Sequence, residues 1–391
     1  MNRVKLSEIT SVITKGTTPM TIGFNFQDEG INFVKVESIA ENGDFILNKF
    51  QHISDECNVK MKRSILFEND ILFSIAGALG RTTIVTKDIL PANTNQALAI
   101  IRLSTSESYP RYIQYVLKSE GVYNQFQRQQ QGVAQLNLSL KNIGDLEIPI
   151  PPLQTQMQIA KTLDTAAELL AMRKQQLAEL DNLIKSTFRE MFGNENEFDK
   201  WDCTTIENVA KVTVGVVIKP AQYYTQESNG VKTFRSLNVG EMSVRDKSWI
   251  FFTPEGHKTN NKSILKTGDV LVVRSGNPGT SCVVTAEYAG CNAVDIIIAR
   301  PNLMKINPLY LCAFTNFPHG KNQIVVGTSG AAQQHFNVGA YKAMTIPLPP
   351  LELQNKFSCL VTKIEEQKTL VKKAIDETQC LFDSLMSEFF K

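Results

Sequence analysis

Two seven-residue stretches determine how this chain is organised: Ile-Pro-Ile-Pro-Pro-Leu-Gln at residues 148–154 and Ile-Pro-Leu-Pro-Pro-Leu-Glu at residues 346–352. Five of their seven positions are identical, at an offset of 198 residues. Proline is tolerated in the first turn of a helix, where its missing N–H would be unpaired anyway. Each stretch therefore predicts the start of a long helix. We expect one helix over 153–192, ended by Gly193, and a second over 351–391.

Both predicted helices carry apolar residues at heptad spacing. The first has one row of Leu163, Leu170, Leu177, Ile184 and Met191, and the second has Val361, Ile375, Phe382 and Phe389 with Phe357, Ile364, Val371 and Leu385. Such spacing over four or more heptads indicates a coiled coil. At 1.5 Å per residue each helix is about 57 Å long, which exceeds the width of a small domain. The polar exceptions Arg173 and Lys368 either set the register or lie outside the contact.

The remainder of the chain also occurs twice. Residues 64–72 match 263–271 at an offset of 199, and the matches continue at Arg102 with Arg300, Pro110 with Pro308 and Tyr112 with Tyr310. Short apolar runs bounded by Gly, Asn and Asp, such as those at 71–73 and 270–273, are typical of buried strands. The sequence predicts an α+β protein with mixed α/β domains at 1–150 and 199–348 and helices at 151–193 and 349–391.

Composition excludes several classes of protein. The 391 residues carry a formal net charge of +2, which by itself does not indicate a nucleic-acid-binding protein. The seven cysteines and four histidines are scattered singly, so neither a disulfide framework nor a metal site is expected. No stretch approaches the roughly 20 apolar residues that span a bilayer, and the first residues lack a signal peptide. We expect a cytoplasmic protein.

Motifs for catalysis are not found in the sequence. A DNA adenine methyltransferase needs a short Asp/Asn/Ser-Pro-Pro-aromatic motif to hold a flipped base. Both Pro-Pro pairs here follow an aliphatic residue and precede leucine. The glycines at 77 and 80, and at 276 and 279, are typical of turns rather than of a phosphate-binding loop. We expect no catalytic residues and no cofactor.

The chain repeats one order of elements twice: a mixed domain, a Pro-Pro-Leu motif and a long helix. In this order it resembles the specificity subunits of type I restriction–modification enzymes over essentially its whole length. Gln156 and Gln354 occupy equal places after the two Pro-Pro-Leu motifs. The pattern Gly-Asp-x-Leu-x4-Gly-x2-Gly at 268–279, matched loosely by 69–80, is also similar to that family. So is the segment 330–336, with 132–138 as its counterpart.

The resemblance implies a function without catalysis. Each mixed domain would be a target-recognition domain that reads one half of a bipartite site in double-stranded DNA. The domains would be separated by the two helices, packed as an antiparallel coiled coil with internal pseudo-two-fold symmetry. Two methyltransferase subunits would dock on this frame, and restriction subunits would join them. The balanced charge leaves an alternative open, namely a two-headed coiled-coil scaffold that recognises protein rather than DNA.

Sequence readout in the major groove uses Arg or Lys for guanine and Asn or Gln for adenine. On that basis and by the resemblance, we expect DNA-binding residues in both mixed domains. In the first domain they are Lys15, Thr17, Thr18, Lys35, Arg81, Gln135 and Asn137, and in the second they are Lys219, Arg235, Arg274, Asn277, Gln333, Gln334 and His335. For each one the alternative is a solvated surface group or a side chain that stabilises a turn.

Overall fold

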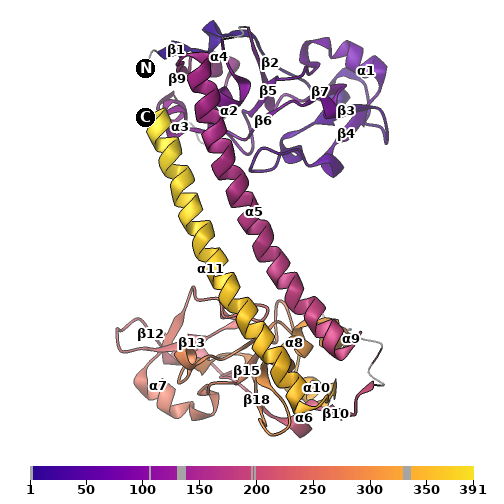
Figure 1. Ribbon diagram of the computed structural model, residues 1–391, viewed down its shortest axis with the longest axis vertical. Helices are drawn as coiled ribbons and strands as arrows, with labels where there is room; N and C mark the ends of the chain where they lie inside the picture. The colour runs from indigo at the N-terminus through magenta and orange to yellow at the C-terminus, as the bar shows by residue number, and fades with distance from the viewer. Residues whose placement is uncertain (1–2, 105–106, 130–137, 195–196, 198–199, 329–335) are drawn as a thin grey trace. The chain divides into compact units, whose positions relative to one another are not determined.

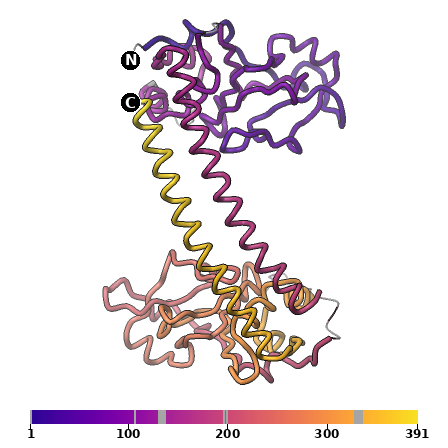
Figure 2. The backbone as a smooth tube through the Cα atoms, in the orientation of Figure 1, coloured from indigo at the N-terminus to yellow at the C-terminus, as the bar shows by residue number. Residues whose placement is uncertain are grey.

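The computed structural model describes residues 3–104, 107–129, 138–194, 197, 200–328 and 336–391. It divides into two compact units: unit 1 contains residues 1–174 and 373–391, and unit 2 contains residues 175–372. In unit 1 the yellow end of the chain lies beside its indigo beginning (Figure 2), where Arg3 donates a hydrogen bond to the carbonyl of Lys391 at 3.2 Å. Among the described residues, no helix is both long enough and apolar enough to cross a membrane.

Unit 1 is built on two sheets and a strand pair (Figure 1). The larger sheet has the order β2 (Thr10–Lys15), β8 (Leu98–Leu103), β5 (Ile71–Ser74), β6 (Thr82–Ile84), and the smaller has the order β4 (Gln51–Ile53), β3 (Ile31–Val34), β7 (Ala92–Thr94). The pair is β1 (Arg3–Lys5) with β9 (Glu147–Pro149). The helices are α1 (Asp55–Lys60), α2 (Pro110–Lys118), α3 (Glu120–Gln129), α4 (Leu140–Gly144), the first part of α5 (Leu153–Phe192) and the last part of α11 (Leu351–Phe390).

Unit 2 repeats this plan. Its larger sheet has the order β11 (Ala210–Val214), β18 (Ile296–Pro301), β15 (Val270–Val273), β16 (Ser281–Val283), and its smaller sheet has the order β12 (Tyr224–Thr225), β14 (Ile250–Phe252), β13 (Val231–Phe234), β17 (Asn292–Ala293). The pair is β10 (Cys203–Thr205) with β19 (Thr345–Pro347). The helices are the last part of α5, α6 (Ile206–Val209), α7 (Pro254–Thr259), α8 (Pro308–Asn316), α9 (Pro318–Thr328), α10 (Val338–Ala343) and the first part of α11. The expected α+β fold and its internal repeat are confirmed.

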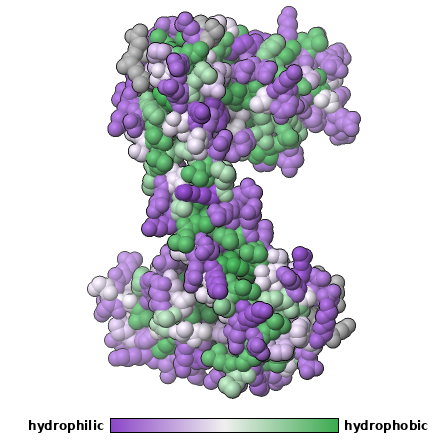
Figure 3. All heavy atoms as spheres, viewed as in Figure 1, coloured by the Kyte–Doolittle hydropathy of each residue, from purple (hydrophilic) through white to green (hydrophobic). Residues whose placement is uncertain are grey.

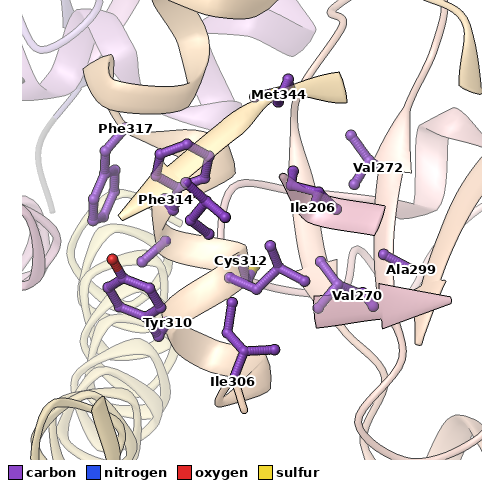
Figure 4. Packing of buried hydrophobic residues seen from close by; sticks show 14 of the residues in the cluster. Ile206, Val270, Val272, Ala299, Ile306, Tyr310, Cys312, Phe314, Phe317 and Met344 are labelled. Carbon is purple, nitrogen blue, oxygen red and sulfur yellow. The ribbon is translucent and has the colours of Figure 1, made fainter. Parts of the chain in front are cut away.

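Each larger sheet packs one face on a proline-initiated helix. In unit 2, Val270 and Ala299 of the sheet lie on the Cys312 side of α8, whereas Tyr310 lies on its other side (Figure 4). Tyr310 is completely buried, and its ring contacts Phe188 and Phe192 of α5. The Tyr310 hydroxyl donates to the Pro347 carbonyl at 2.8 Å, and Tyr112 of α2 donates to Pro149 at 3.0 Å in unit 1. These bonds satisfy the polar end of a large buried aromatic side chain. They also join the helix to the strand that leads into the next long helix.

A buried ion pair joins neighbouring strands of each larger sheet. In unit 2, Nε and Nη2 of Arg300 each lie 2.7 Å from a carboxylate oxygen of Asp269. In unit 1, Arg102 holds Asp70 by the same two bonds. Both carboxylates are 1% exposed. The paired, bidentate geometry compensates for taking the carboxylates out of water.

The long helices have the predicted bounds to within one residue, and the predicted heptad rows are their buried or half-buried sides. In unit 1, Ile159 and Leu163 near the start of α5 pack in one cluster with Phe382 and Phe389 near the end of α11. In unit 2, Phe188 near the end of α5 packs on Phe357 near the start of α11. The helical segments therefore run antiparallel within each unit. Residues between the rows, from 174 to 176 for example, are exposed.

Both polar exceptions to the heptad rows lie inside the helix contact. In unit 1, Arg173 donates to the carbonyl of Ala374 and to the hydroxyl of Thr378. In unit 2, the Nζ of Lys368 lies 2.6 Å from carboxylate oxygens of Asp181 and Glu365. Polar groups at such positions restrict the register in which two helices can pair.

The two glutamines that follow the Pro-Pro-Leu motifs tie each long helix to its unit. Gln156 is completely buried, accepts from the N–H of Tyr109 at 2.9 Å and donates to the carbonyl of Glu107 at 2.8 Å. Gln354 makes the corresponding bonds, accepting from Asn307 at 2.8 Å. Since these partners directly precede α2 and α8, each glutamine joins the first turn of a long helix to the start of the helix that covers the sheet.

Lys118, the last residue of α2, carries a partly buried ammonium group whose Nζ donates to the Asn42 carbonyl at 3.2 Å. Desolvation by burial, helped by nearby Arg111, lowers the pKa of Lys118 to about 8. Its pKa in the unfolded chain is about 10.4. Between these values the unfolded chain binds more protons, so stability rises with pH across this window and the charged amine is destabilising at pH 7.

Replacing Lys118 by methionine is expected to raise the free energy of unfolding at pH 7 by about 1–2 kcal/mol, less than the full pKa shift would give because the amine keeps some contact with water. The pH-dependent gain of the wild type between about pH 8 and 10.4 should shrink to the same extent. Denaturant unfolding at pH 7 and pH 10 measures both. A variant less stable than the wild type at pH 7 would contradict this account.

Candidate nucleic-acid interface

In each unit a loop leaves the first strand of the larger sheet and lies against the smaller sheet; it is called the polar loop after its unit 1 sequence, Gly16-Thr17-Thr18. Its counterpart in unit 2 carries the apolar residues Val216, Val217 and Ile218 before Lys219. A Cβ on Gly16 would stand 1.7 Å from the carbonyl oxygen of Thr94, so only glycine fits there. Gly16 also donates its N–H to the Asn95 carbonyl at 3.1 Å. Gly215 is the equivalent in unit 2, where a Cβ would stand 2.3 Å from the carbonyl oxygen of Ala293. The close approach fixes where the following residues lie.

The unit 1 loop carries three of the expected DNA-binding residues. Lys15 ends β2 and is half-buried. The Thr18 hydroxyl donates to the side-chain oxygen of Gln96 at 2.8 Å, and the Thr17 hydroxyl lies 3.1 Å from that of Thr21. In unit 2, Lys219 follows the equivalent loop, is exposed and has a left-handed backbone with φ of 43°. These four side chains lie at the same end of the larger sheet in their units.

Three other expected residues are engaged within the fold. Arg81 donates to the carbonyls of Ile39 at 2.9 Å and Val36 at 3.4 Å. The Lys35 ammonium lies 4.9 Å from the centre of the Phe26 ring. Arg235 donates to the Ser248 carbonyl at 2.7 Å. Each contact stabilises a loop.

Arg274 is 8% exposed and lies where the segment 329–335 rejoins the described fold. Its Nε donates to the Phe336 carbonyl at 3.2 Å, and its Nη1 lies 2.7 Å from a carboxylate oxygen of Asp295. The Phe336 N–H in turn donates to the Arg274 carbonyl at 2.9 Å. Asn277 is exposed in the adjacent turn. Arg274 thus anchors Phe336, the first described residue after this segment.

Five expected DNA-binding residues lie outside the described residues: Gln135, Asn137, Gln333, Gln334 and His335. The residues that follow their segments occupy equivalent places. Leu138 donates its N–H to the carbonyl of Ile75 at 3.1 Å, as Phe336 does to Arg274. Ile75 and Arg274 both follow the central strand whose end lies beside the polar loop.

Comparison with known proteins identifies the family. The model of the type I restriction modification DNA specificity domain matches residues 1–182 and again 199–378. The chain belongs to this family. It therefore carries two DNA specificity domains, one for each copy of the sequence repeat, and is a type I restriction–modification specificity subunit.

Related specificity subunits support this assignment. The chain is 31% identical over 173 residues to the EcoBI specificity subunit of Escherichia coli, a match that covers 43% of this chain and 36% of that relative. A putative MjaX specificity subunit of Methanocaldococcus jannaschii is 23% identical over 396 residues, covering 96% and 89%. A solved chain from work on assembly and conformational transition of the type I R-M system shares the fold with a TM-score of 0.64, 16% identity and 99% and 96% coverage.

Two observations on this specificity subunit concern metal and thiol chemistry among its described residues. No group of three or more His, Cys, Asp or Glu side chains within them could hold a metal ion. Burial raises the pKa of Cys312 to about 12 and that of Cys291 to about 11. Both thiols are therefore protonated at neutral pH and are poor nucleophiles.

Sequence reasoning missed several polar residues beside the polar loops. Gln96 and Asp295 occupy equivalent places and engage Thr18 and Arg274. A basic turn follows α1 at Lys62–Ser64, and its counterpart follows α7 at Asn261–Ser263. The signal for the turns was present, because Ser64 and Ser263 belong to segments that match at an offset of 199.

Proposed function

We propose that this specificity subunit recognises a bipartite double-stranded DNA sequence, with one half-site read by each unit. The observation that carries the proposal is the presence of two units whose larger sheets have the same topology, each unit matched by the DNA specificity model. Each unit brings the loop after its first strand, a turn at the end of the central strand and the end of a long connecting segment to one end of its larger sheet; the loop is polar in unit 1 and apolar up to Lys219 in unit 2. The base-reading residues would be those expected from the sequence that remain accessible there, including Lys15, Thr17 and Lys219.

We propose that the long helices carry methyltransferase and restriction subunits, which supply all of the chemistry. The helical segments expose apolar side chains in addition to the buried heptad rows (Figure 3): Met172 is 59% exposed in unit 1, and Leu370 is 60% exposed in unit 2. Together with five basic and five acidic residues over 153–192, such a surface suits protein rather than DNA. Two methyltransferase subunits, one for each copy of the repeat, are the stoichiometry that the duplication favours. Such a complex would act in the cytoplasm.

A methyl-transfer assay tests whether the specificity subunit binds DNA without catalysing methylation. The purified full chain, given duplex DNA and labelled S-adenosylmethionine, is expected to transfer no label, whereas the chain with its methyltransferase subunits should label a motif of two half-sites separated by an unspecified gap. Sequencing that maps methylated bases identifies the motif. Stoichiometric transfer by the chain alone, or a single continuous motif, would refute the proposal. Binding to a protein ligand without any DNA preference would favour the protein-recognising scaffold.

A further inference from the structure

A basic turn lies beside the polar loop of unit 1. Lys60 ends α1, and Lys62 and Arg63 follow in the 3-10 turn Lys62–Ser64. All three side chains are exposed. Within the described part of the chain, none of them has a carboxylate at ion-pair distance. Three positive charges thus face solvent within four residues of the sequence.

A buried asparagine places this turn next to the polar loop. Asn93 of β7 is completely buried, and its Nδ2 donates to Asn58 of α1 at 2.8 Å and to the Met61 carbonyl at 3.3 Å. Its Oδ1 accepts from the Ser64 hydroxyl at 2.7 Å. The next residue, Thr94, is the one against which Gly16 packs. One strand therefore holds the basic turn and the polar loop side by side.

Unit 2 has the same arrangement with different side chains. Asn292 of β17 is buried, donates to the Ser263 hydroxyl at 2.8 Å and lies 2.6 Å from a ring nitrogen of His257. The exposed cations here are Lys258 and Lys262. A groove of about 320 Å³ is lined by the apolar start of the loop that follows β11, at Val214–Val216, and by residues 259–263, which include the turn Asn261–Ser263. The adjacency of the two elements is thus kept in both units.

We propose that the basic turn of each unit binds the phosphate backbone of DNA and so positions the neighbouring loop, with Thr17 in unit 1 and Lys219 in unit 2, over the base edges. The inference rests on the proposed function and adds to it a contact surface that the base-reading residues do not include. Lysine and arginine contacts to phosphate set the orientation of a protein on the duplex but carry no sequence information. Unpaired exposed cations fixed rigidly beside a base-reading loop have the chemistry and the position for that task.

The test uses the full chain assembled with its methyltransferase subunits and three double variants. Lys62→Ala/Arg63→Ala alters the turn of unit 1, Lys258→Ala/Lys262→Ala alters the turn of unit 2, and Lys49→Ala/Lys87→Ala removes two exposed lysines elsewhere on unit 1 as a control of equal charge. Affinity is measured from 0.05 to 0.3 M salt for a duplex that carries the methylated motif and for a shuffled duplex. All changed side chains are exposed, so thermal unfolding should be unaltered.

Each turn variant should bind both duplexes about tenfold more weakly at 0.15 M salt, and its plot of log affinity against log salt should be shallower by about 1–2. The methylated motif should be unchanged, and the control should change affinity by less than about twofold. Unaltered affinity and slope in the turn variants, or a loss confined to the motif duplex, would overturn the inference. If the wild-type complex itself failed to distinguish the two duplexes, the proposed function would fail instead.

Discussion

Replacement of Asp269 by alanine is expected to lower the free energy of unfolding of unit 2 by about 2–4 kcal/mol. The change leaves Arg300 without its carboxylate partner and removes the acceptor for the Lys266 N–H, which donates to Asp269 at 2.8 Å. The Arg300 side chain is 37% exposed and can regain water on one side, so the loss should be smaller than for a fully buried arginine. Denaturant unfolding of the full chain measures it.

The matched control for Asp269 is an exposed ion pair of the same unit. Glu241 lies 3.0 Å from Lys185, and the two side chains are 47% and 50% exposed. Glu241→Ala should cost less than about 0.5 kcal/mol, because exposed pairs gain little over hydration. Asp70→Ala should reproduce the effect of Asp269→Ala in unit 1. Equal effects of Asp269→Ala and Glu241→Ala would show that the buried pair does not stabilise the sheet.

Replacement of Arg274 by alanine is expected to relax recognition of one half-site by about 1–3 kcal/mol, or roughly 5- to 150-fold, and to leave the other half-site intact. The proposed reason is positional: Arg274 holds the carbonyl of Phe336 and pairs with Asp295 at the end of a segment that contains Gln333, Gln334 and His335. The readout is the degeneracy of each half of the methylated motif.

The variant Arg274→Lys keeps the positive charge at position 274 but changes the arrangement of its hydrogen-bond donors. Lysine can pair with Asp295 but cannot place two donors in the fixed planar arrangement of arginine. Partial relaxation of the same half-site is therefore expected, with unfolding close to that of the wild type. If both half-sites became degenerate together, independent reading by two units would be ruled out. An unchanged motif for Arg274→Ala would remove Arg274 from the recognition site.

The long helices could be predicted to within a residue because their signals are local. Proline before Leu153, glycine at 193 and the heptad rows all act within a few residues of the backbone they shape. The ion pairs could not be predicted, although the repeat matches Asp70 with Asp269 and Arg102 with Arg300. Their pairing depends on the register of β5 against β8 and of β15 against β18, and strand register is set by long-range packing.

The sequence indicates which side chains could bind DNA, but it does not give the direction in which each one points. Residues 16–18 form a loop after β2, whereas Arg81 turns inward to backbone carbonyls. A sequence shows that an arginine is present but not which way it points, since that depends on the loops packed around it. The basic turns were missed for the converse reason: exposed lysines are ordinary on any surface, and only the anchoring by Asn93 and Asn292 places them beside the polar loops.

The division of each unit between distant parts of the sequence has a consequence for the order in which the protein is made. Unit 2 is complete once residue 372 has been synthesised, whereas unit 1 still lacks residues 373–391. Those residues supply Phe390, whose ring lies 5.6 Å from that of Tyr112, and Thr378, which pairs with Arg173. At about 5–20 residues per second, roughly 10–40 seconds separate residue 174 from residue 373 on the ribosome. Unit 1, which emerges first from the ribosome, is therefore the last to be completed. The apolar face of the first part of α5 stays exposed while unit 2 is synthesised.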